Sequence, residues 1–364
     1  MVIDWSDGNK SSLYSIWLRD HCQMPESRNL DNGQRLFGVK DLPSNITIEK
    51  AYKDAEGNVC VMFQPENHFS VFSQKWLREN CYELNSHFED RSEKSKKLWQ
   101  KDSFENGLPF ISYDLMRSDD TSKVLALRSL RESGFFVLND VPTKDGQVLK
   151  VISELGFTRE TNYGALFEVR TEVNPNNLAF TNLGLGSHTD NPYRDPVPTV
   201  QLLHCLESST EGGESILVDG FKAASILREE SEESFLSLAN TWINYRFSDS
   251  KTELRSRVPM IELNDKKEVI KVRYNNRSID TINVPQDKMR SFYKAYRHWS
   301  EVIDRDELKI QFKLSEGDLM LFDNTRVMHA RTEFSKSGKR HLQGAYSDLD
   351  GLYSLLNTLE DKKK

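Results

Sequence analysis

Short apolar runs separated by turn residues dominate the chain after residue 107. Residues 122–132 form an amphipathic pattern at helical spacing, and Gly134 is placed to cap this predicted helix. Residues 135–138 then predict a buried strand. Further strands are predicted at 200–206, 215–218, 317–322 and 340–346, and further helices at 221–228 and 288–302. Many short strands with a few covering helices indicate a mainly β (α+β) fold, a double-sheet jelly roll.

The N-terminal part has its own β pattern. Residues 45–48 and 59–63 are β-prone, and residues 55–58 between them supply a turn, which predicts a small antiparallel sheet. The highly charged stretch 89–97 indicates a solvated helix or linker, although a polar surface loop within one domain is the alternative. We therefore expect a small N-terminal domain at 1–88, a charged linker at 89–107 and a large domain at 108–364.

The composition excludes several classes of function. The 364 residues carry a formal net charge of −7, which argues against nucleic acid as the main partner. No apolar run is long enough to span a bilayer, and the first residues do not resemble a signal peptide. The four cysteines have no framework spacing, so we expect reduced thiols in a cytoplasmic protein.

The candidate chemistry lies in His188, Asp190 and the distant His329, followed by Arg340. Two imidazoles and one carboxylate can occupy one face of an octahedral Fe(II), leaving three positions for a chelating co-substrate and O2. An arginine shortly after the second histidine can hold a carboxylate of that co-substrate. A His-x-Asp pair alone often occurs by chance. Its context carries the argument, because His329 follows a predicted strand and a polar turn, and Arg340 lies one hairpin later.

Several segments share a family resemblance. They lie at 17–22, 188–193, 201–205, 212–215, 218–221, 322–326 and 340–348. Together they resemble the γ-butyrobetaine and trimethyllysine hydroxylases, which belong to the taurine-dioxygenase-like group of Fe(II)/2-oxoglutarate oxygenases. The resemblance spans nearly the whole chain. It implies a double-stranded β-helix over 108–364, preceded by that family's small N-terminal domain.

The resemblance also implies roles for individual residues. His188, Asp190 and His329 would bind iron, and Arg340 would bind the C5 carboxylate of 2-oxoglutarate. Ser215 stands where a hydroxyl often helps to bind that carboxylate; the alternative is an ordinary strand residue. Two other histidines do not match ligand positions and are expected to be strand residues with satisfied side chains, namely His204 and His341.

The implied reaction consumes O2 and 2-oxoglutarate, releases succinate and CO2, and hydroxylates an unactivated C–H bond. A catalytically silent jelly-roll binding protein is the alternative from a different class, but the complete triad with Arg340 argues against it. A metal hydrolase is a third alternative. It would need a positioned base and would have no use for Arg340.

The resemblance implies that the substrate is a small quaternary-ammonium zwitterion. Proteins hold such a cation with aromatic faces. The positions that match the family's aromatic cage are Tyr163, Phe167, Phe180 and Tyr346. The alternative is that these aromatic residues fill the core. A γ-butyrobetaine-like substrate, giving a carnitine-type product, is the first expectation, with trimethyllysine and 2-trimethylaminoethylphosphonate as alternatives. A homodimer is a family expectation.

The acid end of the substrate needs hydrogen-bond donors. Asn177 and Asn275 match positions that contact the acid group in the family. Arg277 nearby either favours a phosphonate or pairs with Asp280 at the surface; we expect the surface pair.

The family's N-terminal domain holds a structural zinc through three cysteines and a histidine. Here only Cys22 and His68 remain, since Met24 and Ser27 occupy two of the ligand positions. Two ligands cannot complete a closed tetrahedral site, so we expect the zinc to be absent. The domain would then depend on a core of aromatic residues, for which we expect Trp17, Phe63, Phe69 and Trp76.

Overall fold

The computed structural model describes residues 1–84, 96–105, 107–170, 184–335 and 338–362. It divides the chain into two compact units, Met1–Lys94 and Ser95–Lys364. Asn177 and Phe180, two of the expected substrate residues, lie outside the described residues, as does most of the charged stretch 89–97.

Part of the expected linker belongs to the second unit instead. Trp99 is only 2% exposed, and its Nε1 donates a 2.6 Å hydrogen bond to the carbonyl of Ser133. Its ring contacts Phe104 and Phe135 edge-on. The burial of these large apolar rings fixes residues 97–104 against the second unit, despite the charges that precede them.

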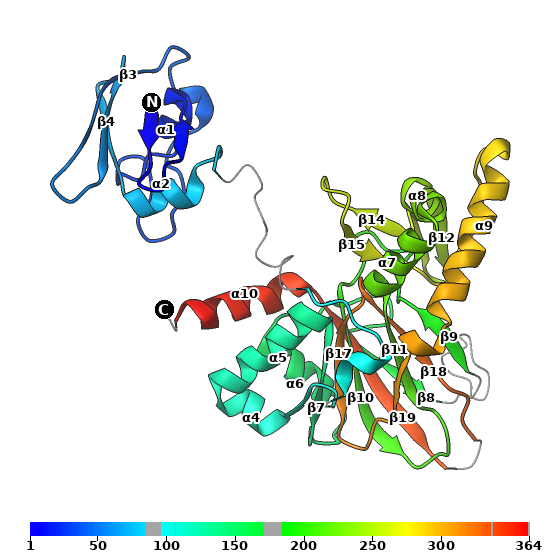
Figure 1. Cartoon of the computed structure of the whole chain (residues 1–364). Helices are drawn as coiled ribbons and strands as arrows, with labels where there is room; N and C mark the ends of the chain where they lie inside the picture. The colour runs from blue at the N-terminus through cyan, green and yellow to red at the C-terminus, as the bar shows by residue number, and fades with distance from the viewer. Residues whose placement is uncertain (85–95, 106, 171–183, 336–337, 363–364) are drawn as a thin grey trace. The chain divides into compact units, whose positions relative to one another are not determined.

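The N-terminal unit is a small β-rich domain (Figure 1). Its strands are β1 (Val2–Asp4), β2 (Lys10–Ser12), β3 (Thr47–Lys53), β4 (Val59–Gln64) and β5 (His68–Phe72), and its helices are α1 (Ser15–Asp20), η1 (Val39–Asp41) and α2 (Gln74–Asn80). Strands β3, β4 and β5 form an antiparallel sheet in sequence order. Both predicted strands are therefore confirmed, the first starting two residues later than expected.

The core of this unit differs from the expectation at one residue. Phe63 is fully buried, and Trp17 and Trp76 pack against the same cluster. Phe69 does not join them; Phe72 is fully buried instead. Because side chains alternate along a strand, residues three apart on β5 point to opposite faces, and Phe72 takes the inward one.

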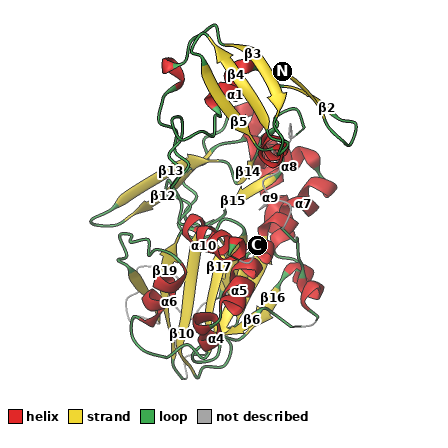
Figure 2. Cartoon of the chain, turned by 90° about the vertical axis from the view of Figure 1, so that its left-hand side faces the viewer, coloured by secondary structure: helices red, strands yellow, loops and turns green. Residues whose placement is uncertain are grey.

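Two sheets form the framework of the second unit (Figures 1 and 2). The larger has the strand order β6 (Phe110–Ser112), β7 (Phe135–Asn139), β17 (Leu319–Asp323), β10 (Val200–Ser208), β19 (Arg340–Ser347) and β8 (Leu166–Arg170). The smaller has the order β16 (Ile310–Phe312), β11 (Ser215–Asp219), β18 (Val327–Arg331) and β9 (Leu185–His188). In both sheets, strands that are far apart in sequence lie next to each other. This arrangement confirms the jelly-roll prediction.

The larger sheet is buried on both faces. Leu319 and Leu321 of β17 pack against the helices that cover one face, whereas Met320 and Phe322 join the core between the sheets. The covering helices are α4 (Tyr113–Ser118), α5 (Asp120–Ser133), α6 (Gln147–Leu155) and α10 (Leu349–Asp361). Burial on both faces explains why this strand is a continuous apolar run rather than an alternating one.

The chain between β11 and β16 forms a separate layer. This layer covers the end of the domain at which the smaller sheet lies. It contains α7 (Gly220–Glu230), α8 (Glu232–Asn240), α9 (Gln286–Ile303) and the hairpins β12 (Ile243–Ser248)–β13 (Glu253–Val258) and β14 (Ile261–Leu263)–β15 (Val269–Val272). The two predicted helices are confirmed as α7 and α9. The short helices η2 (Lys101–Phe104) and η4 (Asp306–Leu308) complete the unit.

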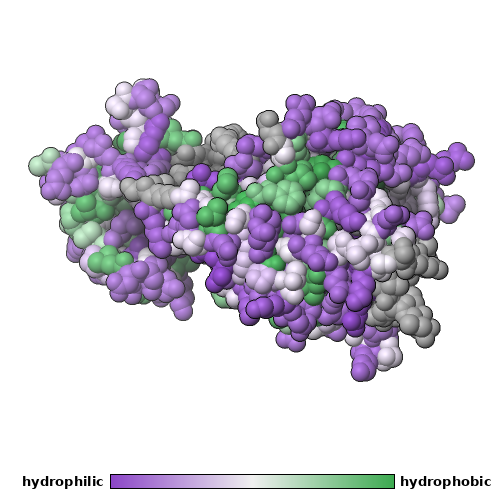
Figure 3. All heavy atoms as spheres, turned by 90° about the horizontal axis from the view of Figure 1, so that it is seen from below, coloured by the Kyte–Doolittle hydropathy of each residue, from purple (hydrophilic) through white to green (hydrophobic). Residues whose placement is uncertain are grey.

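Local signals explain where the elements begin and end. Asp119 accepts a 2.8 Å hydrogen bond from the backbone N–H of Ser122 at the start of α5, and Gly134 ends the helix at φ +82°. Hydrophilic side chains cover most of the face shown in Figure 3. Within the described ranges, none of the helices combines the length and apolar composition needed to cross a membrane.

Candidate iron and 2-oxoglutarate site

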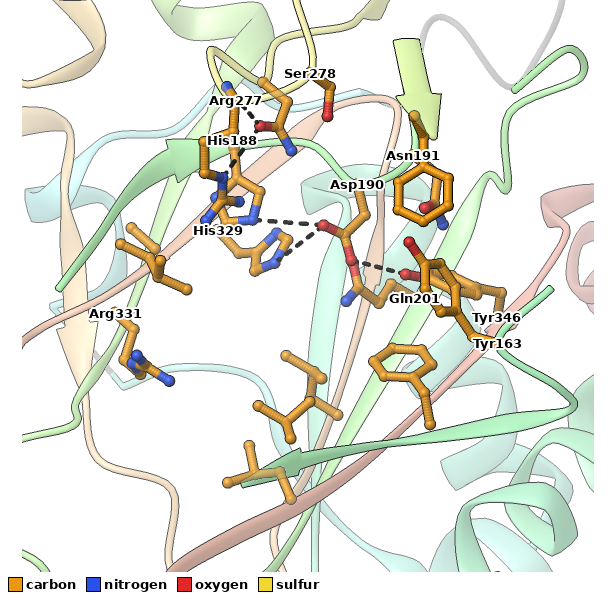
Figure 4. Close-up of a pocket in the computed structure, with 18 of the residues that line it drawn as sticks. Tyr163, His188, Asp190, Asn191, Gln201, Arg277, Ser278, His329, Arg331 and Tyr346 are labelled. Atoms are coloured by element: carbon orange, nitrogen blue, oxygen red, sulfur yellow. Dashed lines mark hydrogen bonds and ion pairs between the residues drawn. The ribbon is translucent and has the colours of Figure 1, made fainter. Parts of the chain in front are cut away.

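Three side chains far apart in sequence meet at one end of the smaller sheet. His188 ends β9 and lies directly across from His329 on β18, and Asp190 follows β9 by two residues. Their candidate ligand atoms all lie within 4.8 Å of one another (Figure 4). Among the described residues, they form the one group of three or more His, Cys, Asp or Glu side chains placed to hold a metal ion.

Neighbouring groups fix the orientation of these side chains. Nδ1 of His188 donates a 2.8 Å hydrogen bond to the carbonyl of Gly186, which leaves Nε2 free to face Asp190. The Asn324 side chain bonds both the N–H and the carbonyl of Asp190, at 2.7 and 2.9 Å. The Tyr346 hydroxyl donates a 2.8 Å hydrogen bond to Oδ2 of the same aspartate. Such outer contacts hold metal ligands in place.

The electrostatics keep the triad ready for a cation. Burial and the neighbouring His188 lower the pKa of His329 to about 3, so its imidazole is neutral. Burial raises the pKa of Asp190, but its interactions with His188, His329 and the Tyr346 hydroxyl outweigh burial, and the net pKa lies below its usual range. Neutral imidazoles and an ionised carboxylate are the forms that bind metal. Two histidines and one carboxylate fit Fe(II) with open positions.

A cavity of about 450 Å³ adjoins the triad, and Arg340 and Ser215 both line it. Ser215 is buried on β11. A Cβ on Gly213 would lie 3.1 Å from Nε of Arg340, and this glycine has φ +70°, so both space and backbone conformation require glycine beside the guanidinium. Among the described residues, no carboxylate pairs with Arg340. The arginine can therefore take a carboxylate of a bound ligand.

The aromatic wall of the cavity is larger than the sequence indicated. Tyr163, Phe167 and Tyr346 line it as expected. Tyr193 and Phe247 were not predicted; their rings stack at 5.1 Å between centroids, and Phe247 meets Tyr163 edge-on at 5.7 Å. The hydroxyls of Tyr163 and Tyr193 share a 3.0 Å hydrogen bond.

A glycine makes this wall possible on the side of β19. A Cβ on Gly344 would lie 2.3 Å from the Phe167 ring, so only glycine lets that ring lie across the strand. Phe167 then stacks on Tyr346, with 5.0 Å between ring centroids.

Polar groups form another part of the lining. Asn275 is buried, donates to the carbonyl of Thr189 at 3.3 Å and accepts from Nε of Arg277, also at 3.3 Å. Arg277 lines the cavity while keeping an exposed surface. The expected surface pair was wrong: among the described residues, Arg277 has no ion pair with Asp280, because its guanidinium turns back to Asn275.

The two remaining strand histidines differ from each other. His341 forms a hydrogen bond with Glu168, as expected of a satisfied side chain. His204 is fully buried, but neither of its ring nitrogens has a hydrogen-bond partner among the described residues. The expectation of a satisfied side chain was therefore wrong for His204, which faces the apolar helix layer.

The expected zinc positions of the N-terminal unit lie together. Nε2 of His68 is 3.3 Å from Sγ of Cys22 and 3.5 Å from Oγ of Ser27. The thiol also accepts a 3.0 Å hydrogen bond from the Ser70 hydroxyl. A serine hydroxyl is a poor zinc ligand, so the cluster offers two of the four donors that a structural site needs.

Other cavity residues escaped prediction. Arg331 lies two residues after His329 on β18, and Gln201 lies on β10. The period of two along a strand was a usable signal for Arg331, because His329 already marked the inward face. Phe247 had no such signal, since its hairpin reaches the cavity only through the tertiary fold.

Comparison with known proteins agrees with this geometry. Residues 96–346 match the model of the taurine catabolism dioxygenase TauD, TfdA family, and residues 1–78 match the gamma-butyrobetaine hydroxylase-like N-terminal family. The gamma-butyrobetaine dioxygenase of Pseudomonas sp. (strain AK-1) is 31% identical over 360 residues, covering 98% of this chain and 93% of the relative. The human enzyme of that name is also 31% identical, covering 100% and 95%.

More distant relatives extend the comparison. The trimethyllysine dioxygenase of Meyerozyma guilliermondii is 28% identical over 373 residues, covering 98% of this chain and 92% of the relative. The solved structure of a putative alpha-ketoglutarate-dependent taurine dioxygenase from Burkholderia xenovorans has a TM-score of 0.50 at 14% identity, covering 65% of this chain and 88% of its own, which supports the fold. The chain therefore belongs to the TauD/TfdA family and is an Fe(II)- and 2-oxoglutarate-dependent dioxygenase with a gamma-butyrobetaine hydroxylase-like N-terminal domain.

Proposed function

We propose that this dioxygenase hydroxylates an unactivated C–H bond of a γ-butyrobetaine-like zwitterion, giving a carnitine-type product. One observation carries the proposal: a single cavity joins the His188–Asp190–His329 triad to Arg340 and to an aromatic wall. The relatives named gamma-butyrobetaine dioxygenase, which align over nearly their whole length, support the same substrate class.

Each part of the cavity has a task in this reaction. His188, Asp190 and His329 would hold the iron, and Arg340 with Ser215 would hold the C5 carboxylate of 2-oxoglutarate. Once bound, iron and 2-oxoglutarate supply the oxidation, in which O2 is consumed, succinate and CO2 are released and a substrate C–H becomes C–OH. The chain contributes by orienting the substrate and excluding water, and no acid–base side chain is required.

The aromatic wall would bind the trimethylammonium group. That group cannot donate a hydrogen bond, so it is held by ring faces, each worth about 0.5–2 kcal/mol. Tyr163, Phe167, Tyr193, Phe247 and Tyr346 supply those rings. Asn275 would bind the acid end, as expected from the sequence. The roles expected for Asn177 and Phe180 stay predictions, because both residues lie outside the described ranges.

Arg277 favours a second candidate, 2-trimethylaminoethylphosphonate. Its guanidinium lies beside Asn275 in the cavity lining, and among the described residues no carboxylate neutralises it. A phosphonate carries more negative charge than a carboxylate and would use this cation more fully.

The four cysteines are buried thiols, which supports the expected cytoplasmic location.

A substrate panel tests the proposal. The purified enzyme with Fe(II), 2-oxoglutarate and O2 should form succinate faster when γ-butyrobetaine is added, with one oxygen gained by the substrate in mass spectrometry. Trimethyllysine and the phosphonate complete the panel, and Asp190→Ala is the inactive control. Stimulation by no trimethylammonium compound would refute the substrate class. A phosphonate preference that disappears in Arg277→Gln would select the second candidate.

A further inference from the structure

The cavity contains a second arginine close to Arg340. Arg331 lies on β18, two residues after His329, and residues two apart on a strand share a face. The strand that supplies an iron ligand therefore also directs Arg331 toward the cavity. The residue is 6% exposed and lines the cavity. In Figure 4 it lies across the cavity from Tyr163 and Tyr346.

Arg331 and Arg340 belong to one cluster. Both guanidinium groups lie against the ring of Phe334, at 4.8 and 5.6 Å from its centroid. Ser215 is the direct cross-strand partner of Arg331. The three residues thus reach the same part of the cavity from β11, β18 and β19.

The charges of this cluster indicate an anionic ligand with high charge. Among the described residues that line the cavity, Asp190 is the one carboxylate, and it belongs to the iron triad. Two guanidinium groups in one enclosed space repel each other and lose hydration. A carboxylate placed between them would relieve both costs with charge-assisted hydrogen bonds.

We propose that Arg331 binds the far carboxylate of 2-oxoglutarate together with Arg340, as a clamp of two cations. The inference rests on the proposed function and adds a residue to its co-substrate site. It places the anionic co-substrate on the side of the cavity opposite the aromatic rings. The clamp selects dicarboxylic 2-oxo acids over monocarboxylic ones.

Binding measurements without O2 test the clamp on the full-length protein. Binding of 2-oxoglutarate and of 2-oxobutyrate, which lacks the second carboxylate, is followed by calorimetry on the Fe(II)-loaded enzyme. Arg331→Met should weaken 2-oxoglutarate binding by roughly 10- to 100-fold, the loss of charge-assisted hydrogen bonds, and leave 2-oxobutyrate binding unchanged. Arg331→Lys should restore part of the affinity. Succinate binding to the metal-free protein should weaken in parallel in Arg331→Met.

Arg246→Met is the matched control, because Arg246 also lines the cavity but pairs with Glu253 at 3.4 Å. It should keep the wild-type affinity for 2-oxoglutarate. Equal weakening of both oxo acids by Arg331→Met, or a change in the substrate KM alone, would overturn the clamp. A wild-type protein that bound no 2-oxoglutarate would instead refute the proposed function on which the clamp rests.

Discussion

The hydroxyl of Tyr346 donates a 2.8 Å hydrogen bond to Oδ2 of Asp190, so one residue serves both the aromatic wall and the iron triad. Its ring stacks on Phe167 while its hydroxyl reaches the carboxylate. The two functions of this side chain can therefore be separated by substitution.

Tyr346→Phe should weaken iron binding and leave the aromatic wall in place. Loss of a hydrogen bond to a metal ligand typically costs 10- to 100-fold in metal affinity, and we expect the lower end of that range. The KM for a trimethylammonium substrate should change little, because the ring is retained. Anaerobic Fe(II) titration and steady-state kinetics measure the two effects.

Tyr163→Phe is the matched control, since its hydroxyl bonds Tyr193 rather than an iron ligand. It should bind iron as the wild type does. If Tyr346→Phe raised the KM and left iron affinity unchanged, the hydroxyl would belong to the substrate site rather than to the support of Asp190.

Phe247→Ala should weaken binding of the cationic end of the substrate. Removing one ring face of about 0.5–2 kcal/mol should raise the KM by roughly 2- to 30-fold. The 2-oxoglutarate requirement should stay constant, because Phe247 lies in the aromatic wall. A neutral analogue with a tert-butyl group in place of trimethylammonium should bind both proteins equally. An equal loss for the analogue would mean that the ring contributes only apolar contact.

Tyr346 and Phe247 show what the sequence predicted and what it did not. The strand that carries Arg340 had a clear local pattern and was predicted. The iron ligands were identified from the His-x-Asp pair and the later histidine, although the strands β9 and β18, which carry His188 and His329, were not predicted. Tyr346 was assigned to the cage through the family resemblance, but its bond to Asp190 was not foreseen, because it depends on how β19 meets the loop after β9.

The remaining misses have similar physical causes. Phe247 lies on β12, whose hairpin reaches the cavity from an insertion more than fifty residues beyond the triad's first histidine. Trp99 was placed in a linker because charges precede it, although a single large ring was enough to fix the segment. Long-range packing decided these cases, and no local pattern reports it.

Arg326→Met should strongly destabilise the second unit. Arg326 and Asp219 form a buried ion pair at 2.9 Å, with side-chain exposures of 1% and 0%. The arginine also donates to the carbonyl of Glu132, and the aspartate accepts from the N–H of Trp99. Removing one partner leaves a buried charge unpaired, which costs about 3–5 kcal/mol of unfolding free energy. Denaturant unfolding measures the loss.

Arg255→Met is the control for that experiment. The side chains of Arg255 and Glu253 form an ion pair while they are 61% and 50% exposed, so solvent screens the pair and it contributes little to stability. Its unfolding midpoint should therefore stay near the wild-type value. Comparable losses in both variants would show that the buried pair contributes no more than a surface pair.

His204 should make the second unit sensitive to acid. Burial lowers the pKa of this histidine to about 4, whereas an unfolded chain has a histidine pKa of about 6.5. Between these values the unfolded state binds a proton that the folded state does not, so stability is full above about pH 6.5 and falls as the pH drops toward 4. The loss approaches about 3 kcal/mol at pH 4.

His204→Leu removes this proton linkage and fills the same apolar site between the larger sheet and its helices. Urea unfolding at pH 7 and pH 4.5 should therefore show a smaller loss of stability in the variant than in the wild type. A variant whose stability fell as steeply as the wild type's would show that other groups cause the acid sensitivity.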